Sequence, residues 1–283
     1  MKARSLSCAC LFTVSTLLLA APALAVKPAG PNAQVAITPA VQAAVDGRGR
    51  DPANVKRDPY RHPAQTLSFF GVQPNQSVVE ITPGGGWYSE ILAPLLRDEG
   101  TYVAAVVDPK AVAEGRGRDY QQRSRDGLEK KFAANPGMYD KVKVQAYDPK
   151  APMFGAPGSA DVVLTFRNVH NWRTANQAEG MFKGFYNVLK PGGTLGVVEH
   201  RAKADVPADD KSGYVGQAQV IAMAEAAGFK LAGSSEINTN PRDTKDYPNG
   251  VWTLPPTNNH DAADAEKYKA IGESDRMTLR FVK

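Results

Sequence analysis

The chain has 283 residues, of which 42% are hydrophobic and 22% are charged, and its formal net charge is +5. This length is enough for one large domain, or one domain with extensions, to bury an ordinary hydrophobic core. The excess of positive charge is too small to indicate a nucleic-acid-binding protein. The basic residues of segment 116–126 also alternate with acidic ones, as on a solvated helix face.

The first 25 residues have the features of a secretory signal peptide. Lys2 and Arg4 precede an apolar run, Leu11–Ala21, and the small-residue pattern Ala23-Leu24-Ala25 follows it. The run is shorter than the roughly 20 residues of a permanent membrane span, so we expect cleavage after Ala25 rather than retention as an anchor. Cleavage would remove both cysteines and two basic residues, which lowers the formal net charge from +5 to +3. We therefore predict an exported, periplasmic protein without a stable membrane span.

Residues 26–62 form an N-terminal arm that is rich in proline, alanine and glycine, with a short helix predicted between Thr38-Pro39 and Gly47. From residue 63 to residue 283 strands and helices alternate. Strands are predicted over 77–81, 102–107, 142–146, 161–166, 194–199, 230–237 and 277–282, and helices over 63–70, 88–96, 117–133, 175–189 and 218–227. Such alternation indicates a mostly parallel α/β sheet with helices on both faces. A long loop insertion, residues 238–276, precedes the last strand.

The turn after the 77–81 strand is the most informative stretch. The apolar strand ends in Gly84-Gly85-Gly86, and a helix follows at once. Glycines let the backbone approach a ligand closely, and the helix N-terminus offers unpaired N–H groups. Asp108 ends the next strand, 22 residues after Gly86, where an acid can accept both hydroxyls of a ribose. A tight turn without a ligand is the alternative, but the acid at this spacing favours a nucleotide-type site.

The segment resembles motif I of the class I S-adenosylmethionine (SAM)-dependent methyltransferases, which reads acid-x-Gly-x-Gly-x-Gly. Glu80 matches the acid, Gly84 and Gly86 match the second and third glycines, and Thr82 stands in place of the first. Asp108 resembles the ribose-binding acid of the family, and Asp148 the acid that reads the adenine amino group.

The resemblance covers residues from about 63 to 237, and the chain is similar to a group of exported bacterial predicted methyltransferases. It implies a Rossmann-like sheet of seven strands, mostly parallel with an antiparallel last strand. It also implies SAM as the cofactor, bound by Glu80, Gly84, Gly85, Gly86, Asp108 and Asp148.

Candidate catalytic residues follow the 161–166 strand, because ligands of open α/β sheets bind beyond the carboxyl ends of the strands. His170 has a side chain whose ordinary pKa suits a general base. Arg167 could hold an anionic substrate group and Asn168 could bond the donor. Capping of the next helix by His170 is an equally weighted alternative. After the 194–199 strand, His200 and Arg201 are further candidates.

Two more segments are candidates for covering the site. Tyr60–Pro63 is either a lid over the glycine turn or a simple linker. The proline-rich stretch 240–256 is either an ordered cover, with Arg242, Asp243 and Lys245 facing substrate, or a surface loop held by Trp252. The four histidines have no zinc-binding spacing, so we expect no metal.

Three functions remain open from the sequence. The first is a SAM-dependent methyltransferase for a small-molecule acceptor, which needs alignment of the reactants and sometimes a base. The second is an exported, non-catalytic binding protein on the same scaffold, since SAM is made in the cytoplasm and fold does not determine function. The third, an NAD-linked oxidoreductase, ranks last because Ser89 stands where Gly-x-Gly-x-x-Gly needs its last glycine.

Overall fold

The computed structural model describes Met1 and residues 36–283. The predicted signal peptide beyond Met1 and the first part of the arm lie outside these residues. Within residues 36–283, no helix combines the length and apolar character needed to cross a bilayer.

A seven-stranded sheet in the order β3-β2-β1-β4-β5-β7-β6 forms the centre of the molecule. Strands β1 to β5 pair in parallel, and β7 pairs antiparallel with both β5 and β6. This confirms the predicted Rossmann-like sheet with an antiparallel last strand. The strands are β1 (Ser77–Ile81), β2 (Thr101–Val107), β3 (Lys143–Tyr147), β4 (Ala160–Phe166), β5 (Leu189–His200), β6 (Lys230–Ser235) and β7 (Arg276–Val282).

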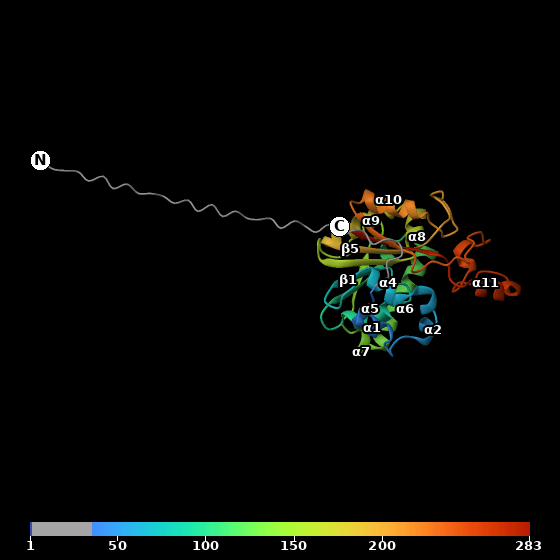
Figure 1. Cartoon of the computed structure of the whole chain (residues 1–283), viewed down its shortest axis with the longest axis horizontal. Coiled ribbons are helices and arrows are strands. Elements are labelled where there is room, and N and C mark those ends of the chain that lie inside the picture. The colour runs from blue at the N-terminus through green and yellow to red at the C-terminus, as the bar shows by residue number, and fades with distance from the viewer. Residues whose placement is uncertain (2–35) are drawn as a thin grey trace.

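Helices cover both faces of the sheet (Figure 1). Because successive strand residues point to opposite faces, Val78 packs in one core cluster and Val79 in the other. One face carries α1 (Pro39–Val45), α4 (Pro63–Phe69), α5 (Ser89–Leu96), α6 (Arg116–Ala134) and α7 (Pro136–Tyr139). The other carries α8 (Val169–Thr174), α9 (Ala178–Val188) and α10 (Gln217–Ala226).

Two predicted elements have different limits in the structure. The helix expected over 175–189 begins only at Ala178, as α9, and a separate short helix, α8, precedes it because Asn176 adopts a positive φ of 55° between the two. Asparagine tolerates this left-handed conformation better than most residues. Helix α8 begins directly after Asn168 and carries His170 in its first turn. Strand β5 begins at Leu189, earlier than predicted, because Leu189 pairs with Ala160 before the register shifts.

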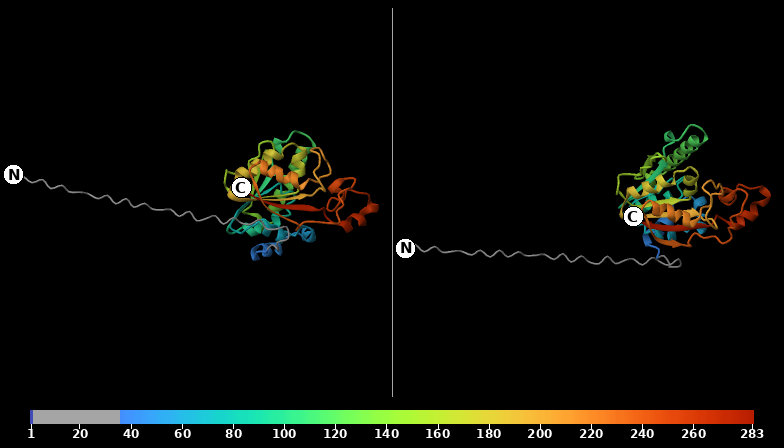
Figure 2. Two further views of the ribbon diagram at one scale, coloured as in Figure 1. Left: turned by 45° about the horizontal axis from the view of Figure 1, so that its top comes forward. Right: turned by 90° about the horizontal axis from the view of Figure 1, so that it is seen from above.

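The arm and the insertion flank the sheet. Residues 36–62 form α1, α2 (Pro52–Val55) and α3 (Asp58–Arg61). The insertion contains η2 (Gly250–Thr253), η3 (Ala262–Asp264) and α11 (Ala265–Ile271), and a further short turn, η1 (Pro109–Ala111), follows β2. The insertion protrudes at the end of the sheet opposite the C-terminus (Figures 1 and 2). Since β7 runs antiparallel to its neighbours, this end is the carboxyl end of the parallel strands, where ligands of open α/β sheets bind.

Candidate active site

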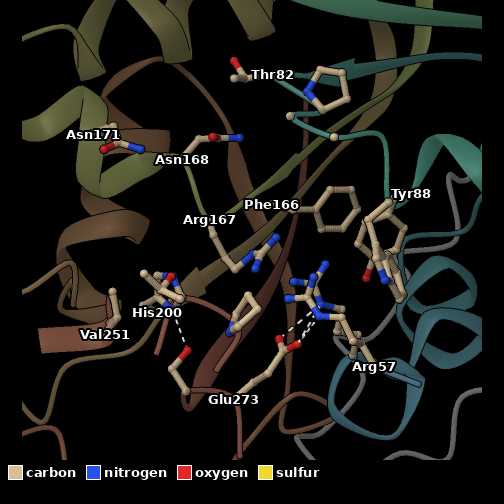
Figure 3. Close-up of a pocket in the computed structure, with 18 of the residues that line it drawn as sticks. Arg57, Thr82, Tyr88, Phe166, Arg167, Asn168, Asn171, His200, Val251 and Glu273 are labelled. Atoms are coloured by element: carbon tan, nitrogen blue, oxygen red, sulfur yellow. Dashed lines mark hydrogen bonds and ion pairs between the residues drawn. The ribbon is translucent and has the colours of Figure 1, made fainter. Parts of the chain in front are cut away.

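A cavity of about 370 Å³ lies at the carboxyl ends of β1, β4 and β5 (Figure 3). Its volume is within the range of small-molecule sites. Most of its wall comes from four parts of the chain: the arm, the glycine turn after β1, the segments after β4 and β5, and the insertion. They contribute, respectively, Asn54, Arg57 and Arg61; Thr82, Pro83, Gly84 and Gly85; Arg167, Asn168, His170, Asn171 and His200; and Val251, Trp252, Pro255, Pro256, Thr257, Glu273 and Ser274.

The three glycines of the turn have different structural roles. A Cβ atom added at Gly84 or Gly85 would meet nothing within 4 Å, so both leave the cavity wall open. A Cβ at Gly86 would lie 2.9 Å from Cδ1 of Leu128, and Gly86 has a positive φ of 73°. Gly86 therefore allows α6 to pack under the turn, whereas Gly84 and Gly85 provide space for a ligand.

Thr82, which stands where the family has its first glycine, adopts the backbone conformation that glycine favours. Its φ is +51°, unusual for a β-branched residue. Its hydroxyl lies 2.8 Å from the hydroxyl of Tyr147 at the end of β3, and this hydrogen bond holds it in place. Thr82 thus takes a positive φ in the turn and adds a side chain to the cavity wall.

Glu80 is buried beneath the glycine turn and also borders the cavity. Its carboxylate accepts hydrogen bonds from the hydroxyls of Tyr102 on β2 and Ser89 on α5. Burial raises the pKa of Glu80 to about 7, although these hydrogen bonds act in the opposite direction. These hydrogen bonds connect the end of β1, just before the glycine turn, to β2 and α5.

Asp108 and Asp148 lie outside the cavity wall, at the ends of β2 and β3. Each caps its own turn: Oδ1 of Asp108 accepts the backbone N–H of Lys110 at 3.0 Å, and Oδ1 of Asp148 accepts that of Lys150 at 2.8 Å. Both are half-buried and keep a second carboxylate oxygen beyond these bonds. Among the residues predicted to bind the cofactor, Glu80, Gly84 and Gly85 therefore line the cavity, Gly86 lies below it, and the two acids stand apart from it.

His170 forms a pair with Glu199, the penultimate residue of β5. Its Nδ1 lies 3.0 Å from Oε1 of Glu199. Glu199 is fully buried and also accepts the backbone N–H groups of Val169 at 2.6 Å and His200 at 2.8 Å. With the Nδ1 proton donated to Glu199, Nε2 of His170 carries the free lone pair. The pair has the arrangement of a general base with an orienting carboxylate. Glu199 also accepts backbone N–H groups from the first turn of α8 and so helps to fix the start of this helix.

His200 lies beside this pair, with its ring centroid 5.5 Å from that of His170. Its Nδ1 is 2.5 Å from Oγ of Ser274. Burial, together with the charges of His170 and Arg167, lowers the pKa of His200 well below its ordinary value. His200 is therefore neutral at physiological pH.

His170, Glu199 and His200 also place ligand atoms within 4.8 Å of one another, which the sequence spacing did not reveal. Both oxygens of Glu199 already accept N–H groups, three of them from the backbone. This favours a hydrogen-bonded pair over a metal centre.

Three arginines converge on Glu273, which stands just before β7. Nε of Arg57 lies 2.7 Å from Oε1 of Glu273, and Nε of Arg61 lies 3.1 Å from Oε2. Nη1 of Arg276 is also 3.1 Å from Oε2. Arg167, whose backbone φ is +62°, extends into the same region from the end of β4 (Figure 3). Of these residues the sequence pointed to Arg167, and to Arg61 through the possible lid at Tyr60–Pro63.

The remaining candidates divide into those near the cavity and those outside it. Nδ2 of Asn168 donates to the carbonyl of Ile81 at 3.0 Å, which joins the ends of β4 and β1 at the cavity wall. Trp252 covers the cavity, with its ring centroid 6.0 Å from that of His170. Arg201 pairs with Glu236 and Asp275 outside it.

Arg242, Asp243 and Lys245, which one of the two alternatives for segment 240–256 placed against substrate, do not line the cavity. Asp243 is buried and accepts hydrogen bonds from Tyr214 and the backbone of Asp275, and Lys245 pairs with Asp275 at 2.6 Å. Arg242 is exposed. These contacts hold the insertion against the sheet, so their role is structural.

Solved structures with this fold include methyltransferases and a cyclase. A SAM-dependent methyltransferase from Aquifex aeolicus is 15% identical, with a TM-score of 0.53 over 82% of this chain and 94% of that one. The cyclase SpnF is 14% identical, with a TM-score of 0.56 over 86% of this chain and 92% of that one. No protein-family profile and no curated protein sequence matches the chain. At these identities the likeness establishes the fold alone, a Rossmann-like α/β fold that the methyltransferase and the cyclase share with this chain.

Proposed function

We propose that the protein is a SAM-dependent methyltransferase for a small-molecule acceptor. The observation that carries this proposal is the single cavity that joins the glycine turn after β1 to the His170–Glu199 pair. A cofactor over the turn and an acceptor beside the histidine would then share one cavity, which permits the alignment that methyl transfer requires.

The residues present fit the cofactor. The open wall at Gly84 and Gly85 leaves room for its methionine end, next to Glu80. Asp108 follows β2, the neighbour of β1, and Asp148 follows β3, the next strand along. Both would accept hydrogen bonds, from the ribose and the adenine respectively, with the oxygens that their turns leave unused. When bound, SAM supplies an electrophilic methyl group.

The chain's own residues would prepare the acceptor. Nε2 of His170 accepts the proton of the attacking group, and Glu199 holds the ring in the required tautomer and stabilises the resulting cation. Asn168 keeps the ends of β1 and β4 together, which holds the turn and the base at a constant separation. Trp252 and the adjoining prolines cover the cavity and limit the entry of water.

Calorimetric titration of the mature protein, residues 26–283, tests this proposal. We expect SAM and S-adenosylhomocysteine to bind and NAD to leave no heat of binding. Asp108→Ala should abolish adenosyl binding, and the exposed control Asp209→Ala should leave it unchanged. A folded protein that binds neither adenosyl compound would overturn the proposal.

Two observations favour a second candidate, a non-catalytic binding protein on this scaffold. Thr82 replaces a glycine of the motif, and the acids at 108 and 148 lie outside the cavity wall. Such a protein would bind a ligand in the cavity without transferring a methyl group from labelled SAM to any compound in a periplasmic extract. Export of the chain remains part of both proposals.

A further inference from the structure

The floor of the cavity carries more positive than negative charge. Arg57, Arg61, Arg167 and Arg276 gather around one carboxylate, that of Glu273. Burial raises the pKa of Glu80, the other acid of the cavity wall, to about 7, so between two and three positive charges are in excess. The side chains of Arg61 and Arg276 are only 3% and 4% exposed. Burying charge without a counterion is costly, and arginine stays protonated in proteins. Binding of an anion from outside the described residues would balance this excess of positive charge.

Hydrogen-bond donors of the same cluster are unused. The Nη2 atoms of Arg57 and Arg61 are buried and have no hydrogen-bond partner among the described residues. Arg57, Arg61 and Arg167 all border the cavity. Burial and the charge of Arg276 lower the pKa of Arg167 to about 10, as expected of cations that repel one another. Unsatisfied buried donors destabilise the protein, the more so when they are charged, unless a ligand accepts their hydrogen bonds.

The scaffold holds these guanidinium groups in fixed positions. Arg61 stacks over the ring of Trp87 at 4.7 Å from its centroid, and Arg50, paired with Asp58 at 2.7 Å, lies 5.2 Å from the same centroid. Nη2 of Arg276 donates to the carbonyl of Tyr60 at 2.6 Å. Preorganised arginines that converge on one space are typical of sites for phosphate or carboxylate groups.

We propose that Arg57, Arg61 and Arg167 form an oxyanion site that binds the phosphate or phosphonate group of a small molecule. The further statement that this molecule is the methyl acceptor rests on the proposed function. A phosphate ester carries nearly two negative charges and three acceptor oxygens, enough to occupy the unused donors and offset most of the excess charge. SAM carries a sulfonium, an ammonium and one carboxylate, so its own binding would add positive charge. The anion must then come from the acceptor.

Thermal unfolding and calorimetry with inorganic phosphate, without any cofactor, test the site. At constant ionic strength, phosphate should raise the unfolding temperature more than sodium chloride or succinate does. Arg167→Gln should weaken phosphate binding about 10- to 100-fold, as expected for a lost charged hydrogen bond. The same variant should unfold at a higher temperature than wild type in the absence of phosphate, because it removes a cation without a carboxylate partner.

Arg201→Gln is the matched control. Arg201 is paired with Glu236 and Asp275 outside the cavity, so its loss should lower the unfolding temperature and leave phosphate affinity unchanged. Equal phosphate affinity in wild type and Arg167→Gln would overturn the proposed site. A preference for succinate would overturn phosphate as its ligand.

The outcomes separate this site from the proposed function. Phosphate binding without S-adenosylhomocysteine binding would support the oxyanion site and overturn the proposed methyl transfer. S-adenosylhomocysteine binding without phosphate binding would overturn the oxyanion site and leave the proposed methyl transfer standing. If the two ligands bind together, the anion belongs to the acceptor. If they compete, the arginines hold the carboxylate of the cofactor, and the proposed acceptor class is wrong.

Discussion

His170 joins two strands through one short contact. It stands in the first turn of α8, after β4, and its partner Glu199 ends β5. Because β4 and β5 are parallel neighbours, their carboxyl ends bring the two side chains together. A buried carboxylate that already accepts backbone N–H groups is fixed in position, and it fixes the ring in turn.

Replacement of His170 tests its role as the base. In His170→Ala we expect methyl transfer to fall by about 10²- to 10⁴-fold, the usual contribution of a general base. The affinity for S-adenosylhomocysteine, measured by calorimetry, should stay near wild type. His260→Ala, which changes a histidine that packs on Tyr268 outside the cavity, is the control. Activity that survives in His170→Ala would show that the assignment is wrong.

Glu273 makes stability depend on pH. Burial raises the pKa of Glu273, but the charges of Arg276, Arg61 and Arg57 outweigh this effect and lower it from 4.5 to about 2. A lowered pKa in the folded state means that the carboxylate stabilises the fold above pH 4.5 and that this stabilisation disappears as the pH falls toward 2. It amounts to about 3 kcal/mol for Glu273.

Urea unfolding between pH 6 and pH 2.5 measures this dependence. The free energy of unfolding should fall with decreasing pH, and Asp275, whose pKa is also about 2, should add to the slope. In Glu273→Gln the slope should be smaller, and the protein should be less stable at pH 7 because its arginines lose their carboxylate. An unchanged slope in this variant would contradict the assignment.

At the scale of elements, the turn between β1 and α5 contains one glycine that allows helix packing and another that faces the ligand cavity. Gly86 has a positive φ and lies against α6, whereas Gly85 faces the cavity with nothing near its Cβ position. The turn is further held by Lys131 of α6, whose Nζ lies 3.1 Å from the carbonyl of Gly85 and 2.5 Å from Glu90 of α5. Neighbouring glycines should therefore respond differently to the same substitution.

Gly86→Ala should lower the free energy of unfolding by about 1–3 kcal/mol, since it forces a side chain against Leu128. Gly85→Ala should change stability by less than about 0.5 kcal/mol but weaken the binding of S-adenosylhomocysteine. Urea unfolding and calorimetry on the two variants measure both effects. Equal ligand affinity in wild type and Gly85→Ala would argue against a cofactor at this turn.

For the whole molecule, the arm and the insertion close the cavity from opposite ends of the sequence. Arg57 and Glu273 are 216 residues apart and form one ion pair. Asn54 donates to Glu90 of α5 at 2.9 Å, and Trp87 donates to the carbonyl of Asn54 at 3.1 Å. These contacts make the arm part of the site.

Removal of the arm tests this arrangement. A chain that begins at Pro63 would leave the buried Glu90 and Glu273 with fewer partners, so we expect it to unfold at a lower temperature and to lose phosphate binding. Circular dichroism melting and the phosphate titration described above are the measurements. A truncated chain as stable as residues 26–283 would show that the arm is a linker.

Export is a prediction that rests on the signal-peptide features of residues 1–25. When the protein is produced in a bacterium, we expect it in the periplasmic fraction with a mass that begins at Val26. Replacing Ala23 and Ala25 by lysine should block cleavage, because the site needs small residues. Full-length protein in the cytoplasmic fraction would contradict the prediction.

The sequence by itself determined the order of strands and helices, because hydrophobic runs, glycines and prolines act locally. Strand β1 lies at the predicted residues 77–81, and the glycine turn follows it as expected. Local signals also pointed to His170 and Arg167, since both directly follow a strand at the ligand end of the sheet.

Only the tertiary structure decided which side chains meet. It paired His170 with Glu199, gathered arginines from the arm, the end of β4 and the start of β7 around Glu273, and left Asp108 and Asp148 outside the cavity wall as turn caps. Such contacts depend on how distant segments pack and close loops, and no local pattern records them.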